Sequence, residues 1–284
     1  MIYVSSTCIE AETIKDSVTI LAEAGLKNIE LSGGTNYYAE YERDLLRLQD
    51  KYELNYLVHN YFPPPEKPFV LNLASMNADV REQSILLCKK AIRLSKKLSG
   101  KRYGVHAGFL IDIDPWEAGK NIGHRRLSDR NEALNIFVDA WKLITEEADG
   151  VVTLYVENNV YSSTNATTYS GSNPFLLTDY RDYQELNNRM DINLLLDVAH
   201  LKVSSNSLGL DFDDELEKLF AVSDYIHLSD NDGSHDQNKI ITNNSDILKK
   251  LDGHSVIKKN ITLEVCDELE KILSSFRVVK TLLI

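Results

Sequence analysis

Histidine, aspartate and glutamate side chains recur in this chain at one kind of place, the end of a short apolar run. The residues concerned are His59, His106, Glu157, Asp197, His200, His227 and Glu264. Imidazole nitrogens and carboxylate oxygens bind divalent cations such as Zn, Mn, Mg and Co. If the fold buried these side chains together, their charges would be costly unless a cation coordinated them. The pattern therefore predicts a metal site that holds one or two divalent ions.

Each of these residues, taken alone, has a simpler interpretation. Glu157 in LYVEN could be a core carboxylate paired with a Lys or Arg, and His106 in GVHAG could be a hydrogen-bonded core histidine. The metal interpretation is favoured because the pattern repeats at five or six successive apolar runs. Of the other histidines, we expect His124 and His254 at the surface, and His235 in a polar loop is left open.

Alternating strand-like and helical patterns must position these side chains. The predicted strands are Ile2–Ser6, Asn28–Ser32, Asn55–His59, Tyr103–His106, Thr153–Asn158, Ile192–Asp197, Tyr225–Ser229 and Ile261–Val265. The predicted helices are Thr13–Ala24, Tyr41–Tyr52, Asp79–Leu98, Asp129–Ala148, Asp179–Arg189, Asp213–Ala221, Ser245–Leu251 and Asp267–Leu282.

Strict alternation of strand and helix indicates parallel strands joined by crossover helices. Eight such units in 284 residues predict a single (β/α)8 barrel domain over residues 1–284. An open doubly wound sheet is disfavoured because no Gly-rich phosphate loop follows the first strand. In a barrel, the strand ends converge on one mouth. The long loops Tyr61–Asn77, Phe109–Leu127 and Val160–Leu177 would lie over that mouth.

Composition narrows the classes of function. The net charge of −12 argues against a protein that grips duplex DNA through its phosphates. We expect the basic stretch Lys89–Lys101 to be the solvated face of a helix. No apolar run approaches the roughly 18 residues of a membrane span, the N-terminus does not resemble a signal peptide, and three cysteines give no disulfide framework. A cytoplasmic protein is expected.

The chain resembles the xylose isomerase-like barrel superfamily, which includes sugar isomerases and epimerases and endonuclease IV-type enzymes. The resemblance covers nearly the whole chain and rests on NIELSGG, VHNYFPPPEKPFVLNLAS, GVHAGF, LYVENN, LLLDVAHLKVS, YIHLSDNDGSHDQN and ITLEVCD. It implies that Glu157, Asp197, His227 and Glu264 form the family's metal quartet on strands five to eight.

The isomerase branch of this superfamily implies a small sugar or sugar phosphate as substrate. Glu157 and Glu264 would face each other across it and move a proton at the carbon next to the carbonyl, while a metal acts as Lewis acid. His200 would help to hold the substrate. Nucleic acid and membrane partners are not expected, and a homo-oligomer is compatible with this class.

The endonuclease IV branch implies a rival activity, zinc-dependent phosphodiester cleavage. In that branch His59 and His106 would bind one zinc bridged by Glu157. Asp197, His227 and Glu264 would complete a second site, and His200 would help to bind a third.

The third zinc site also requires an Asp-x-His pair after strand seven. Here the stretch is Asp236-Gln237-Asn238, so Asn238 stands where the histidine is expected. An amide is a poor zinc ligand beside imidazole, which disfavours this branch unless His235 substitutes. A dehydratase or lyase that acts on a cyclic polyol through the same quartet is a further alternative. Arg102, Arg125, Arg126 and Lys202 are candidate phosphate partners, but for each we expect a surface charge.

Overall fold

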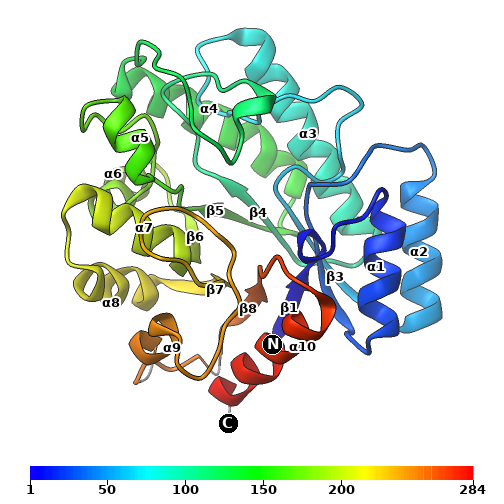
Figure 1. The fold of residues 1–284 in the computed structure, drawn as a ribbon. Helices are drawn as coiled ribbons and strands as arrows, with labels where there is room; N and C mark the ends of the chain where they lie inside the picture. Colours follow the sequence, from blue (N-terminus) through cyan, green and yellow to red (C-terminus); the bar gives the residue numbers. More distant parts are fainter. Residues whose placement is uncertain (252, 257, 284) are drawn as a thin grey trace.

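The computed structural model describes residues 1–251, 253–256 and 258–283. Within them, eight parallel strands form a closed barrel in sequence order, and β1 pairs with β8 to complete it (Figure 1). The strands are β1 (Ile2–Ser5), β2 (Asn28–Leu31), β3 (Asn55–His59), β4 (Arg102–His106), β5 (Thr153–Glu157), β6 (Asn193–Asp197), β7 (Ser223–Leu228) and β8 (Asn260–Leu263). The predicted (β/α)8 barrel is confirmed, with every strand within two residues of its expected bounds.

Helices surround the barrel and follow the strands along the chain (Figure 1). They are α1 (Ile14–Glu23), α2 (Tyr41–Tyr52), α3 (Ala78–Lys97), α4 (Arg130–Ala148), α5 (Ser163–Thr168), α6 (Tyr180–Arg189), α7 (Val198–Leu208), α8 (Phe212–Val222), α9 (Asp246–Leu251) and α10 (Leu269–Lys280). Short 3-10 turns occupy Ser6–Cys8, Pro115–Glu117 and Thr281–Leu283. All eight predicted helices are present, whereas α5 and α7 were not expected.

Helix α7 was missed because no turn separates it from the strand before it. Asp197 is both the last residue of β6 and the N-cap of α7, where its side chain accepts a hydrogen bond from the backbone N–H of His200. Helix α5 is a single short segment of Ser, Thr, Asn and Ala within the loop expected over Val160–Leu177. Its start is stabilised by Ser162, which accepts from the N–H of Asn165.

Side chains along each strand point alternately outward and inward, and they form two separate apolar layers. One set of strand side chains packs outward against the helices in the main core, which includes Val4, Val58, Val156 and Ile226. The intervening residues face the barrel interior, where Tyr3, Leu57, Tyr155, Leu195 and Tyr225 form a separate cluster. The barrel is therefore a filled core whose upper end can hold polar side chains rigidly.

The long loops after β3, β4 and β5 pack on one another through their own apolar cluster. Val70, Phe109, Ile111, Ile122, Tyr161, Tyr169 and Phe175 make up this cluster. Phe109 and Phe175 are also joined by an antiparallel β-bridge. The loops thus form a packed wall over the carboxyl ends of the strands. None of the described helices is long and apolar enough to cross a membrane.

Candidate metal centre

All seven predicted site residues lie at the carboxyl end of the barrel. His59, His106, Glu157 and Asp197 are the last residues of β3, β4, β5 and β6. His227 is the last but one residue of β7, Glu264 directly follows β8, and His200 lies in the first turn of α7. One ligand atom from each of Glu157, Asp197, His227 and Glu264 can be chosen so that all four lie within 4.8 Å of one another.

Glu157 is the hub of the cluster. Its Oε2 atom lies 2.7 Å from Nε2 of His59 and 3.2 Å from Nδ1 of His106. Its Oε1 atom lies 3.3 Å from Nδ1 of His227 and 3.9 Å from Nδ1 of His200. The residue is fully buried, so this carboxylate has the position of a bridging ligand between two groups of imidazoles.

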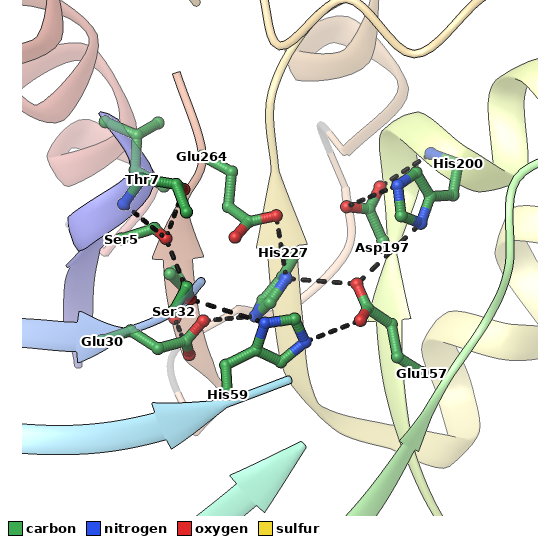
Figure 2. A network of polar contacts seen from close by, with 12 residues as sticks. Ser5, Thr7, Glu30, Ser32, His59, Glu157, Asp197, His200, His227 and Glu264 are labelled. Atoms are coloured by element: carbon green, nitrogen blue, oxygen red, sulfur yellow. Dashed lines mark hydrogen bonds and ion pairs between the residues drawn. The ribbon is translucent and has the colours of Figure 1, made fainter. Parts of the chain in front are cut away.

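Glu157 and Glu264 approach the same nitrogen of His227 from different sides (Figure 2). Nδ1 of His227 lies 3.2 Å from Oε2 of Glu264 and 3.3 Å from Oε1 of Glu157. One N–H cannot point at both carboxylates with good geometry, whereas a cation among the three atoms would contact them all.

Several atoms at the centre of this cluster lack hydrogen-bond partners. In the part of the chain that the structure describes, Oε1 of Glu157, Nδ1 of His106 and Nδ1 of His227 are buried without one. Buried polar atoms are normally satisfied. His227 and Glu157 belong to one group of close ligand atoms with Asp197 and Glu264, and His106 belongs to a second group with Glu157 and His200. These donor sets fit one or two divalent cations beside Glu157.

The pKa shifts in the cluster agree with a site for a divalent cation. Burial alone would lower the pKa of His227 and His200, but the surrounding carboxylates outweigh it and hold both pKa values well above the usual range. Burial would likewise raise the pKa of Glu157, but His106, His59 and His227 hold it well below its usual value. Protons thus neutralise the cluster in the way that a cation would.

Two further groups titrate in unusual ranges because they are buried. Burial raises the pKa of Asp197 to about 7, with a further contribution from the charges of Glu157 and Asp236. Burial lowers the pKa of His106 to about 4, in spite of the nearby Glu157. His106 is therefore neutral at physiological pH, the form in which imidazole can bind a metal.

Asn158, which directly follows β5, holds Asp197 and His200 in place. Asn158 donates from its side chain to the carbonyl of Asp197 at 2.9 Å and accepts from the N–H of Asp197 at 2.7 Å. Nδ1 of His200 lies 3.0 Å from the carbonyl oxygen of Asn158, which leaves Nε2 facing Asp236 at 3.4 Å. His200 therefore presents Nε2 toward the open side of the cluster.

A pocket of about 340 Å³ opens beside the cluster. Its floor includes His106, His200 and Asp236, and one wall is the apolar surface of the loop cluster with Phe109 and Phe175. The lining also includes amide and hydroxyl groups, those of Asn121, Asn159, Ser162, Asn165 and Asn238. The pocket could hold a small polar molecule next to the candidate metal centre.

Residues at the position of the third zinc site of the endonuclease IV branch also border this pocket. Asn238 lines it together with His235. Both ring nitrogens of His235 contact hydroxyls, Nε2 that of Thr164 at 2.7 Å and Nδ1 that of Ser234 at 2.9 Å. Both ring nitrogens of His235 thus have hydroxyl partners in the metal-free protein.

The remaining expectations concern surface residues. Arg126 and His124 are exposed, and Arg125 pairs with Asp114 and Glu117. The basic stretch lies at the end of α3, where Arg93 and Lys97 form ion pairs with acidic residues of neighbouring helices.

Arg102, Lys202 and His254 are less exposed than the sequence suggested. Arg102 pairs with Asp224 at the amino ends of β4 and β7, and Lys202 pairs with Asp230. Their side chains are 21% and 14% exposed, respectively. The ring of His254 packs on Phe220 with a centroid distance of 4.8 Å. Aliphatic stems and rings of this kind are buried by neighbours that sequence does not specify.

Glu30 in β2 was missed by the sequence analysis, although it is a fully buried carboxylate next to His227. The available signal was a single charged residue within the apolar run NIEL. It was not used because Glu30 lies inside a strand and not at its end.

Comparison with known proteins places the fold in a family. The profile of the xylose isomerase-like TIM barrel family matches residues 18–273. The chain belongs to the xylose isomerase-like TIM barrel family. No curated protein sequence matches the chain.

Solved structures of this family's fold include both branches. A D-tagatose 3-epimerase-like protein superposes with a TM-score of 0.74 at 21% identity, over 99% of this chain and 96% of that one. The D-psicose 3-epimerase of Clostridium cellulolyticum, solved with D-tagatose, gives 0.67 at 10% identity and 99% coverage of both chains. Endonuclease IV of Thermus thermophilus gives 0.62 at 14% identity, over 99% and 98% of the two chains. At these identities the likeness shows the fold and not the reaction.

Proposed function

We propose that this protein is a divalent-metal-dependent isomerase or epimerase of a small sugar or sugar phosphate. The observation that carries the proposal is the placement of Glu157 and Glu264 on two sides of Nδ1 of His227, 3.3 and 3.2 Å away. Two carboxylates held around one cation site, beside a pocket of about 340 Å³, suit proton transfer at a bound carbohydrate. The sugar epimerases among the similar structures support this reaction class.

Glu157, Asp197, His227 and Glu264 would hold the metal, with His59 and His106 available for a second ion. The metal, when bound, supplies a Lewis acid that polarises the oxygens of the substrate. Glu264 has 15% of its side chain exposed, whereas Glu157 has 1%, so Glu264 is the carboxylate more accessible to a substrate carbon.

Proton transfer then follows from the two carboxylates. One removes the proton from the carbon next to the carbonyl, and the other returns a proton to the substrate. His200, with Nε2 directed to the pocket side, would donate to a substrate hydroxyl. The packed loops after β3, β4 and β5 would exclude water from the reacting carbon.

Glu157→Gln and Glu264→Gln test this mechanism. Each variant should lose about 10²–10⁴-fold in turnover of a cognate ketose, and each should stop the exchange of the substrate C–H with D₂O, followed by NMR. Glu268→Gln, an exposed glutamate four residues after Glu264, serves as control and should exchange normally. Full exchange in both site variants would rule out the two-carboxylate mechanism.

A second function, phosphodiester hydrolysis of the endonuclease IV type, is favoured by one specific observation. His59 and His106 both contact Oε2 of Glu157, which gives the site more ligands than one ion requires. Nicking of an abasic-site duplex by the metal-loaded protein would support this function. Three zinc ions per chain would do so too, whereas one or two ions and proton exchange on a sugar support the epimerase. Release of water from a cyclic polyol would instead indicate the lyase alternative.

A further inference from the structure

Strand β2 contributes none of the predicted ligands, yet its Glu30 lies against the ring of His227. Oε1 of Glu30 is 3.0 Å from Nε2 of His227, and both side chains are fully buried. The other ring nitrogen, Nδ1, faces Glu157 and Glu264. The two nitrogens of this one imidazole thus face different carboxylates, with Glu30 on the side away from Glu157 (Figure 2).

Hydroxyl groups from two other strands fix the Glu30 carboxylate. Thr262 of β8 donates to Oε2 at 2.8 Å, and the hydroxyl of Tyr225 in β7 donates to the same oxygen. Oε1 of Glu30 and Nε2 of His227 have no hydrogen-bond partner among the described residues, and the nearest charged contact of each is the other atom, at 3.0 Å. Oε2 is therefore occupied, and Oε1 is directed to the imidazole.

A neutral imidazole carries its proton on only one of its two nitrogens, and only the other nitrogen can bind a metal. A carboxylate next to Nε2 stabilises the proton on that atom, which leaves the lone pair of Nδ1 for the cation. We propose that Glu30 is a positioning residue of the metal centre, which fixes the His227 ring with Nε2 protonated and Nδ1 as the ligand atom.

A direct ligand role for Glu30 is the competing arrangement. Ligand atoms of Glu30, His59 and Glu264 also lie within 4.8 Å of one another. The positioning role is favoured because Oε2 accepts two hydroxyl donors and Oε1 faces a ring nitrogen. A metal on Glu30 would have to displace one of these contacts.

Glu30→Gln tests the proposal because it keeps the shape of the side chain and removes its charge. Zinc affinity would be measured by competition with a chromophoric chelator. The tautomer of His227 would be measured by ¹⁵N NMR of protein labelled at histidine and assigned by comparison with His227→Gln. Glu215→Gln is the matched control, because Glu215 is a buried carboxylate on α8 that accepts a backbone hydrogen bond from Tyr180 at 2.6 Å.

We expect Glu30→Gln to bind zinc about 10–100-fold more weakly and to show a mixture of His227 tautomers in the metal-free protein at a pH high enough for the ring to be neutral. Glu215→Gln should match the wild type in both. If Glu30→Gln does not fold, Tyr225→Phe replaces it. That variant removes one donor that fixes Glu30, and it should shift the tautomer ratio in the same direction.

Two results would overturn the positioning role. Unchanged affinity and tautomer in the folded Glu30 variant would leave Glu30 as a packing residue. Loss of one ligand, seen in the visible spectrum of the cobalt-loaded variant, would make Glu30 a direct ligand. The proposal rests on the metal centre alone, and no sugar is present in the assay. Its failure is therefore separate from failure of the proposed isomerase function.

Discussion

Asp197 caps the start of α7 and is also a candidate metal ligand, and different substitutions can separate these two roles. Its Oδ1 atom accepts the N–H of His200 at 2.7 Å and so begins α7, while the same carboxylate belongs to the candidate metal quartet. An asparagine could still accept at the N-cap, whereas an alanine could not. Metal binding and helix stability should therefore respond differently to the two changes.

Asp197→Asn and Asp197→Ala should both weaken zinc binding, since both remove the carboxylate. When a chelator keeps the protein metal-free, only Asp197→Ala should lose the cap. The cap is worth about 1 kcal/mol of unfolding free energy. Urea unfolding of the two metal-free variants measures that difference. Equal stability of the two would contradict the capping role of this side chain.

At the scale of elements, α6 is joined to α4 by a partly buried carboxylate. Asp182 of α6 contacts Arg130 of α4 at 2.5 Å and accepts from the N–H and hydroxyl of Thr178. Burial, with the nearby charge of Asp179, raises the pKa of Asp182 to about 6 in spite of Arg130. In the unfolded chain the same carboxyl has the ordinary aspartate pKa of 3.8.

The raised pKa of Asp182 predicts a pH dependence of stability. Between about pH 4 and 6 the folded state holds a proton that the unfolded chain has released, so rising pH lowers the contribution of Asp182 to stability. Asp182→Asn removes this slope. The free energy of unfolding, measured with urea from pH 4 to 7, should rise in the variant relative to the wild type as pH increases. A constant difference across this range would contradict the assignment, and Glu185→Gln, the other Arg130 partner, is the control.

At the scale of the molecule, the candidate metal centre draws its residues from six of the eight strands and their ends. Ligand candidates come from the ends of β3 to β8, and β1 closes the barrel by pairing with β8. A cation at this point would therefore hold distant parts of the chain together. Because it binds the folded state and has no formed site in the unfolded one, it should stabilise the whole barrel.

Adding a divalent metal at about a thousandfold excess over its Kd should stabilise the metal-free protein by about 4 kcal/mol. At about 2–4 °C per kcal/mol for chains of this size, Tm should rise by roughly 10 °C, as measured by calorimetry with and without chelator. Glu157→Gln should show a much smaller rise. An equal rise in the variant would place the stabilising ion elsewhere.

Much of the barrel and its site was predictable from local patterns. Apolar runs of four to six residues followed by helical periodicity mark each strand, as the observed bounds of β1 to β8 confirm. A parallel barrel brings the carboxyl ends of its strands together, so chemistry-bearing residues such as His59 and Glu264 could be assigned to one mouth before any contact was known. Helix α7 was not predictable in this way, because Asp197 ends the strand and begins the helix with no loop between them.

Contacts between distant strands were decided only by the tertiary structure. Glu30 and Tyr225 are 195 residues apart, and they meet because closure of the barrel directs alternate side chains of β2 and β7 to the same interior. Likewise, sequence assigned His227 to the site but could not say which ring nitrogen faces which carboxylate, since side-chain packing sets that orientation. Residue types and spacing thus determined where the chemistry gathers. The folded barrel determined which atoms face one another there.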